Sequence, residues 1–106
     1  MHFELTTADA AAREEVYRLR HAVYAAELGQ YGLEPSGLLP DAPGVDCIYL
    51  TARIDGELAG FVGVTPPTSP RFSVDRHLAR RESPVPFGRD LYEIRALTVD
   101  SAWRMQ

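Results

Sequence analysis

Apolar residues recur with a helical period in one segment of the chain and with a strand period in several others, which predicts one long helix among several strands. From Ala10 onward, apolar residues recur at steps of three and four, which places them on one side of an α-helix. Residues 6–9 carry hydroxyl and carboxylate side chains that can cap a helix start, and Gly29 is a common helix stop. We therefore predict a helix from Ala10 to about Leu28.

The remaining apolar positions mostly follow the period of two that is typical of strands. Four segments are predicted strands: residues 2–5, 47–54, 58–65 and 91–99. Asp55-Gly56 joins the second and third as a tight turn, so these form a central antiparallel hairpin. Between the third and fourth strands, residues 73–80 are expected to form two helical turns capped by Ser73. This order predicts an α+β fold, with a long helix packed on a mixed, mostly antiparallel sheet.

A single helix covers only one face of such a sheet. Leu97 and Val99 would then expose apolar surface, so we expect more of the chain or a second subunit to pack there. Since side chains two residues apart share a strand face, Glu93 is expected to lie beside Arg95, Leu97 and Val99. The loop of residues 30–45 is long for a passive connection, which points to a functional role.

Composition narrows the class of protein. With 106 residues, 45% hydrophobic and 25% charged, the chain fits one small globular domain. No apolar run reaches the length of a membrane span, and the first residues do not resemble a secretory signal, so we expect a cytoplasmic protein without a membrane partner. The net charge of −4 argues against binding to nucleic acid, which needs a basic surface.

Individual residue types exclude further chemistry. Cys47 is the only cysteine and sits in a strand pattern, so we interpret it as a small buried hydrophobe. The three histidines are far apart and have no metal-ligand spacing, so we expect no metal site. All eleven basic residues are arginine; the chain therefore contains no lysine for Schiff-base chemistry or a lysine-dependent phosphate loop.

The hairpin "ARIDGELAGFVGV" and the following "LYEIRALTVDSAWR" resemble the Gcn5-related N-acyltransferase (GNAT) superfamily. Residues 97–104 fit its L-x-V-x-x-x-x-R pattern, which precedes a glycine-rich loop that binds the coenzyme A pyrophosphate. The segments "LRHAVYAAELG", "TPPTSPRF" and "YEIRALTV", with Asp46, look most similar to autoinducer synthases and related N-acyl amino-acid synthases. By this resemblance, residues 1–106 are expected to be the N-terminal portion of a GNAT-like domain, truncated after the fourth strand.

The resemblance implies an N-acyltransferase that moves an acyl group from acetyl-CoA or a longer acyl-CoA to the amine of a small molecule such as an amino acid. An acyl-carrier protein is an alternative donor. Glu93 is the candidate general base. The candidate substrate-binding residues are Arg20, Tyr24, Asp46 and Arg95. The candidate cofactor-binding residues are Leu97, Thr98, Val99, Arg104 and Gln106. The expected partner is the missing C-terminal half or a second subunit.

Each assignment has a structural alternative. Glu93 would equally serve in an ion pair with Arg95 or Arg53, Asp46 as a strand cap, and Arg104 as a solvated side chain. For the whole chain, the alternatives are a non-catalytic GNAT-like binding or regulatory module without the pyrophosphate loop, and an unrelated small α+β domain.

Overall fold

The strands form one antiparallel sheet in the order β1-β2-β3-β4, so each strand pairs with its neighbour in sequence. The computed structural model describes residues 1–104. The strands are β1 (Phe3–Thr7), β2 (Ile48–Ile54), β3 (Glu57–Thr65) and β4 (Glu93–Val99). The α+β class and the antiparallel pairing are confirmed, and every strand pair is antiparallel where a mixed sheet was expected.

The long helix begins and ends close to its predicted bounds. Its first part is α1 (Ala10–Arg20), capped by Asp9, whose carboxylate accepts the Ala12 N–H at 2.9 Å. The chain continues as a π-helix, η1 (His21–Glu27), and Gly29 follows with φ of 66°. π-Helical turns are rare and frequently lie at functional sites. Here the wider turn follows Arg20 directly, and Arg20 lines a cavity of about 320 Å³.

The turn between β2 and β3 is the predicted hairpin turn. Asp55 and Gly56 have φ of 50° and 85°, the positive values that a two-residue turn needs to match the twist of its strands. The Asp55 carboxylate also accepts the His2 N–H at 2.7 Å, at the end of the hairpin where β1 begins. This one turn therefore stabilises the register of three strands.

The core lies between the helix and one face of the sheet. Val16, Leu19 and Val23 pack from the helix against Tyr49 and Phe61 of the central strands. The prediction that Cys47 is buried is confirmed, and it is 3% exposed. Gly63 has no room for a side chain, because a Cβ there would meet the Cys47 sulfur at 2.7 Å.

A β-bulge divides β4 into two halves. Phe61 pairs with Thr98 and Gly63 with Arg95, so two residues of β4, Ala96 and Leu97, oppose Val62 alone. Ala96 adopts φ of 55°, which is unusual for a residue with a Cβ. The bulge shifts the side-chain alternation by one residue.

The prediction that Glu93, Arg95, Leu97 and Val99 share one face is therefore wrong. Glu93 and Arg95 lie on the helix-covered face, as Thr98 does, since their partners in β3 are alternate residues. Leu97 and Val99 lie on the opposite face and are 76% and 41% exposed. A strict period of two cannot continue across an inserted residue.

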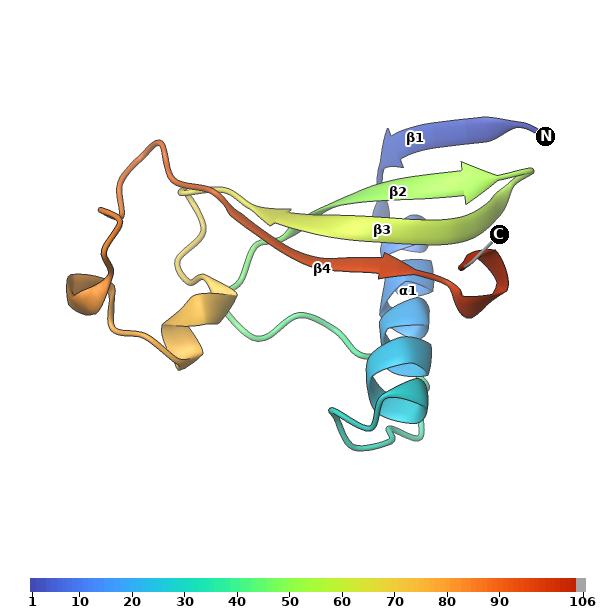
Figure 1. Ribbon diagram of the computed structural model, residues 1–106, viewed down its shortest axis with the longest axis horizontal. Helices are drawn as coiled ribbons and strands as arrows, with labels where there is room; N and C mark the ends of the chain where they lie inside the picture. Colours follow the sequence, from blue (N-terminus) through green and yellow to red (C-terminus); the bar gives the residue numbers. More distant parts are fainter. Residues whose placement is uncertain (105–106) are drawn as a thin grey trace.

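The chain between β3 and β4 projects beyond the end of the sheet (Figure 1). It contains two short 3₁₀-helices, η2 (Ser73–Arg76) and η3 (Arg80–Glu82), in place of the predicted two-turn helix over residues 73–80. Ser73 is not the cap. The Phe72 N–H is bound instead by the Asp75 carboxylate at 2.8 Å, and Arg80 also binds Asp75, at 2.8 Å.

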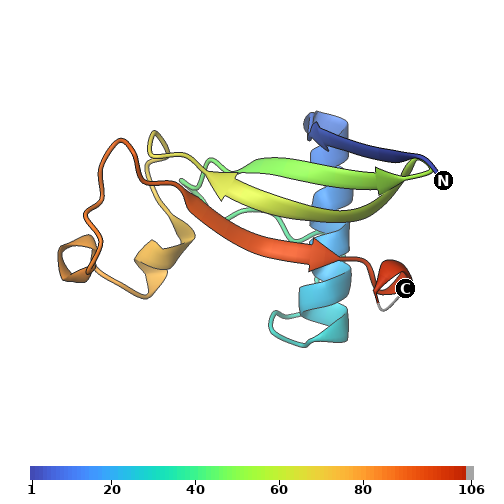
Figure 2. The same ribbon diagram turned by 45° about the horizontal axis from the view of Figure 1, so that its top comes forward.

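The two faces of the sheet are covered unequally. Figures 1 and 2 show the helix crossing one face, while no other element of residues 1–104 covers the opposite face. The exposed large apolar side chains on that face come from β1, β2 and β4, and they are Phe3, Leu5, Ile48, Leu50, Ile94, Leu97 and Val99. Within the described residues, no helix has the length and apolar character needed to cross a membrane.

Candidate functional site

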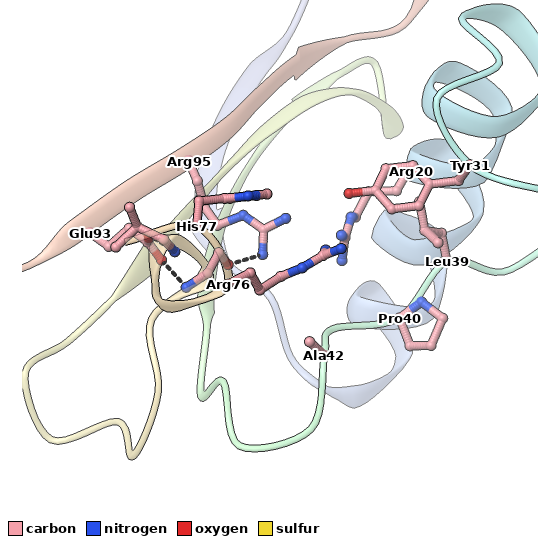
Figure 3. A pocket seen from close by; sticks show the side chains of 11 residues that line it. Arg20, Tyr31, Leu39, Pro40, Ala42, Arg76, His77, Glu93 and Arg95 are labelled. Atoms are coloured by element: carbon pink, nitrogen blue, oxygen red, sulfur yellow. Dashed lines mark hydrogen bonds between the residues drawn. The ribbon is translucent and has the colours of Figure 1, made fainter. Parts of the chain in front are cut away.

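A cavity of about 320 Å³ opens beside the first half of β4. The end of α1, the loop before β2, the helix η2 and β4 all contribute to its walls. Figure 3 shows Arg76 and Arg95 on one side of this space, with Arg20 and Tyr31 on the other. Its lining residues are Arg20, Tyr31, Leu39, Pro40, Ala42, Ser73, Val74, Arg76, His77, Glu93 and Arg95.

Arg20 is a buried cation at the cavity wall. The residue is 4% exposed, and its Nη1 donates to Asp41 Oδ1 and to the Tyr49 hydroxyl, each at 3.1 Å. Its Nε is buried without a hydrogen-bond partner among residues 1–104. A buried donor without an acceptor costs about 1–3 kcal/mol, so the guanidinium has binding capacity that the protein itself leaves unused.

The Asp41 carboxylate is the hub of the polar network behind this wall. Its Oδ2 accepts from Arg13 Nη2 at 3.2 Å and from the Tyr17 hydroxyl at 3.1 Å. Its Oδ1 accepts from Arg20 and from the Tyr49 hydroxyl. These bonds hold the long loop against the helix and fix the position of Arg20.

The Asp41 network was not predicted from the sequence. A signal was present, because Arg13, Tyr17 and Arg20 recur at steps of four and three and so form a polar stripe on the helix. Such a stripe beside a core needs a buried acid. The sequence does not show which acid supplies it, since Asp41 lies in an irregular loop.

Burial, above all, raises the pKa of the Tyr49 hydroxyl, with a smaller contribution from Asp41, so Tyr49 stays a neutral donor.

Glu93 and Arg95 reach the cavity from β4 but do not pair with each other. The two Glu93 carboxylate oxygens accept the backbone N–H groups of Ser73 and Val74 at 2.8 and 2.9 Å. Arg95 Nη1 donates to the Ser73 hydroxyl at 2.6 Å. Both side chains thus fasten η2 to the sheet. The ion pair considered for Glu93 is not formed, because Arg53 binds Glu15 instead.

Past Arg95, the wall continues over the bulge into a second cavity of about 200 Å³. It is lined by Arg20, Tyr24, Gln30, Tyr31, Arg95 and Ala96. Arg20 and Tyr24 meet here, one helical turn apart. The Tyr24 hydroxyl is hydrogen-bonded to the Thr98 hydroxyl at 2.9 Å, which in turn donates to the Ala96 carbonyl at 2.9 Å. The helix therefore supports the bulge directly.

Beyond the bulge, a groove runs between the end of the helix and the second half of β4. Its lining residues are Val23, Tyr24, Leu28, Leu97, Thr98, Val99 and Arg104. The structure thus brings Leu97, Thr98, Val99 and Arg104 together, while Thr98 itself is buried and 3% exposed.

Arg104 already has a carboxylate partner at the end of this groove. Its Nη1 and Nη2 donate to the two Glu27 carboxylate oxygens at 2.5 and 2.8 Å, which lowers the pKa of Glu27. A phosphate would compete with Glu27 for Arg104. Asp46 is exposed and lines neither cavity nor groove. Gln106 lies outside the described residues.

Comparison with protein-family models, with curated proteins and with solved structures found no match to this chain.

Proposed function

We propose that this chain forms part of an N-acyltransferase, with the acyl donor on one side of the β4 bulge and the amine acceptor on the other. The observation that carries the proposal is the bulge at Ala96. It lies between the arginine-lined cavity and the groove that ends at Arg104. Bulges commonly lie next to active sites, where they interrupt pairing and re-aim the chain.

The donor side is the groove along Leu97, Val99 and Arg104. β4 is an edge strand, so an extended ligand arm has access to backbone groups along its free edge. Arg104 can bind a phosphate when its ion pair with Glu27 is broken. Breaking this ion pair costs little free energy, because both side chains are 37% exposed. These residues fit an acyl-CoA, which supplies a thioester carbonyl that an amine can attack.

The acceptor side is the cavity of Glu93 and Arg20. Each Glu93 oxygen accepts one backbone N–H, and a carboxylate oxygen has a second acceptor position. Glu93 is therefore able to take a proton from an incoming amine without releasing η2. In this reaction a C–N bond forms as the C–S bond of the thioester breaks, and the amine proton goes to Glu93. The coenzyme A thiolate is the leaving group, and it takes up a proton from solvent to give the free thiol.

Thiol release from acetyl-CoA and longer acyl-CoAs in the presence of small amines tests this function. The chain's own thiol does not interfere, because Cys47 is buried and burial raises its pKa. Deletion of Ala96 would leave Arg95 and Thr98 in their present register while removing the bulge. We expect amine-dependent thiol release that the deletion abolishes and that Glu93→Gln reduces by about 10²-fold or more.

The matched control is Glu82→Gln, which removes the same charge from an exposed position in η3. It is expected to leave the rate unchanged. Equal rates in wild type and in the Ala96 deletion would rule out the bulge as the reacting site.

A binding module without catalysis is the second candidate. It is favoured by the contacts of Glu93 and Arg104, since both side chains already bind groups of the protein. The same assay separates the two functions: acyl-CoA binding without amine-dependent thiol release supports the module.

A further inference from the structure

The 320 Å³ cavity beside the first half of β4 has more cationic than anionic side chains at its wall. Arg20, Arg76 and Arg95 line it, against a single carboxylate, Glu93. Glu93 is bound by two backbone N–H groups and the Arg20 charge is shared with Asp41. The Arg76 side chain is exposed and forms no hydrogen bond or ion pair with any residue of the described chain, so its charge is available to a ligand.

The free donors come from two separate elements. Arg20, at the end of α1, has its Nε buried and without a partner in residues 1–104, and only its Nη1 is used by the protein. Arg76 reaches the same cavity from η2 (Figure 3). Guanidinium groups make strong charge-assisted hydrogen bonds to planar carboxylates, often in pairs.

Besides the charged residues, the wall contains Tyr31, Ser73 and His77 and a group of four apolar residues that offers a surface to an aliphatic ligand. Leu39, Pro40, Ala42 and Val74 line the cavity. A volume of about 320 Å³ is at the small end for ligand sites in proteins. This combination fits a short aliphatic body with one anionic end, and Glu93 is the acceptor available to an amine.

We propose that this cavity binds a small aliphatic α-amino acid, with its carboxylate at Arg20 and Arg76 and its amino group toward Glu93. Binding itself does not depend on catalysis; only the role of the amino acid as acyl acceptor rests on the proposed function.

Titration of the ¹⁵N-labelled chain by NMR tests the site with three matched probes. L-Leucine carries both groups, L-leucinamide lacks the carboxylate, and 4-methylpentanoate lacks the amine. We expect L-leucine to shift the Arg20 Nε–H resonance and to bind at least 10-fold more tightly than L-leucinamide, with 4-methylpentanoate between them. Equal affinity for L-leucinamide, no binding of L-leucine, or binding of inorganic phosphate in its place would overturn the proposal.

Substitution of Arg76 provides an independent test of the site. Arg76→Gln is expected to retain the fold, since Arg76 has no partner in the described structure, and to weaken L-leucine binding about 10-fold. Arg81→Gln is the matched control, because this side chain is 86% exposed. If both variants bind L-leucine as wild type does, Arg76 is not part of the site and the proposal fails.

The two proposals fail in distinguishable ways. L-Leucine binding without thiol release from acyl-CoA would retain the site and remove the acyltransferase. Thiol release with L-leucinamide as fast as with L-leucine would retain the acyltransferase and remove carboxylate recognition.

Discussion

The two faces of one sheet have similar sequence character but different surroundings. On the helix-covered face, Val16 of the helix is fully buried, and Tyr49 and Phe61 are 1% and 3% exposed. On the open face, Leu5 and Leu97 are 82% and 76% exposed. Both faces of the sheet carry apolar side chains. Only the helix-covered face stabilises this chain, because an apolar side chain contributes to stability when it is removed from water, and residue type alone does not achieve this.

Replacement of Asp41 by alanine should have the largest effect on the covered face. It removes the acceptor of four donors and leaves Arg20 buried without a counter-charge. We expect the free energy of unfolding to fall by about 3–5 kcal/mol, measured by urea denaturation. Asp90→Ala, at an exposed position in the loop before β4, is the control. A loss below about 1 kcal/mol would show that the network does not hold the loop.

Matched truncations on the two faces test the comparison directly. Val16→Ala should lower the free energy of unfolding by about 2 kcal/mol through lost burial and a residual cavity. Leu5→Ala, on the open face, should change it by less than about 0.5 kcal/mol. Similar losses at both positions, in urea denaturation of the dilute chain, would mean that the open face is covered in solution.

The smallest expected effect concerns the segment between β3 and β4. Arg80 and the Phe72 N–H hold the Asp75 carboxylate and lower its pKa to about 2. Because the folded pKa is depressed, this stabilisation is complete above the ordinary value near 4 and is lost as the pH falls toward 2. The pair lies near the surface, so we expect about 1 kcal/mol or less.

Thermal unfolding between pH 5 and pH 2 measures this contribution. The melting temperature of Asp75→Asn should fall less over this range than that of wild type. Parallel curves for the two proteins would argue that the Asp75–Arg80 pair has no effect on stability.

Local signals in the sequence predicted most of the elements. Asp9 and Gly29 mark the ends of the long helix, and Asp55-Gly56 marks the hairpin, because capping and turn formation depend on a few adjacent residues. The prediction that side chains alternate strictly along β4 was wrong at Ala96, where the bulge lies. A bulge depends on how two strands pair, and neither strand alone records it.

The candidate site was predictable only in part. Arg20, Tyr24, Glu93 and Arg95 were identified, and each lines at least one of two cavities that share lining residues. Asp46 was identified and does not. Arg76 and Asp41 were missed as site components, since an irregular loop and a 3₁₀ turn have no periodicity from which to infer the direction of a side chain.

The sequence by itself determined the α+β class, the helix, the central hairpin and the burial of Cys47. These follow from periodicity and from interactions between near neighbours in the chain. Only the tertiary structure decided that Asp41 neutralises Arg20, that Glu93 binds the backbone of η2, and that a bulge at Ala96 shifts the alternation of β4. Those outcomes depend on contacts between residues far apart in sequence. Arg20 and Asp41, for example, are separated by 21 positions, and the geometry of their contact is set when the helix and the loop pack together.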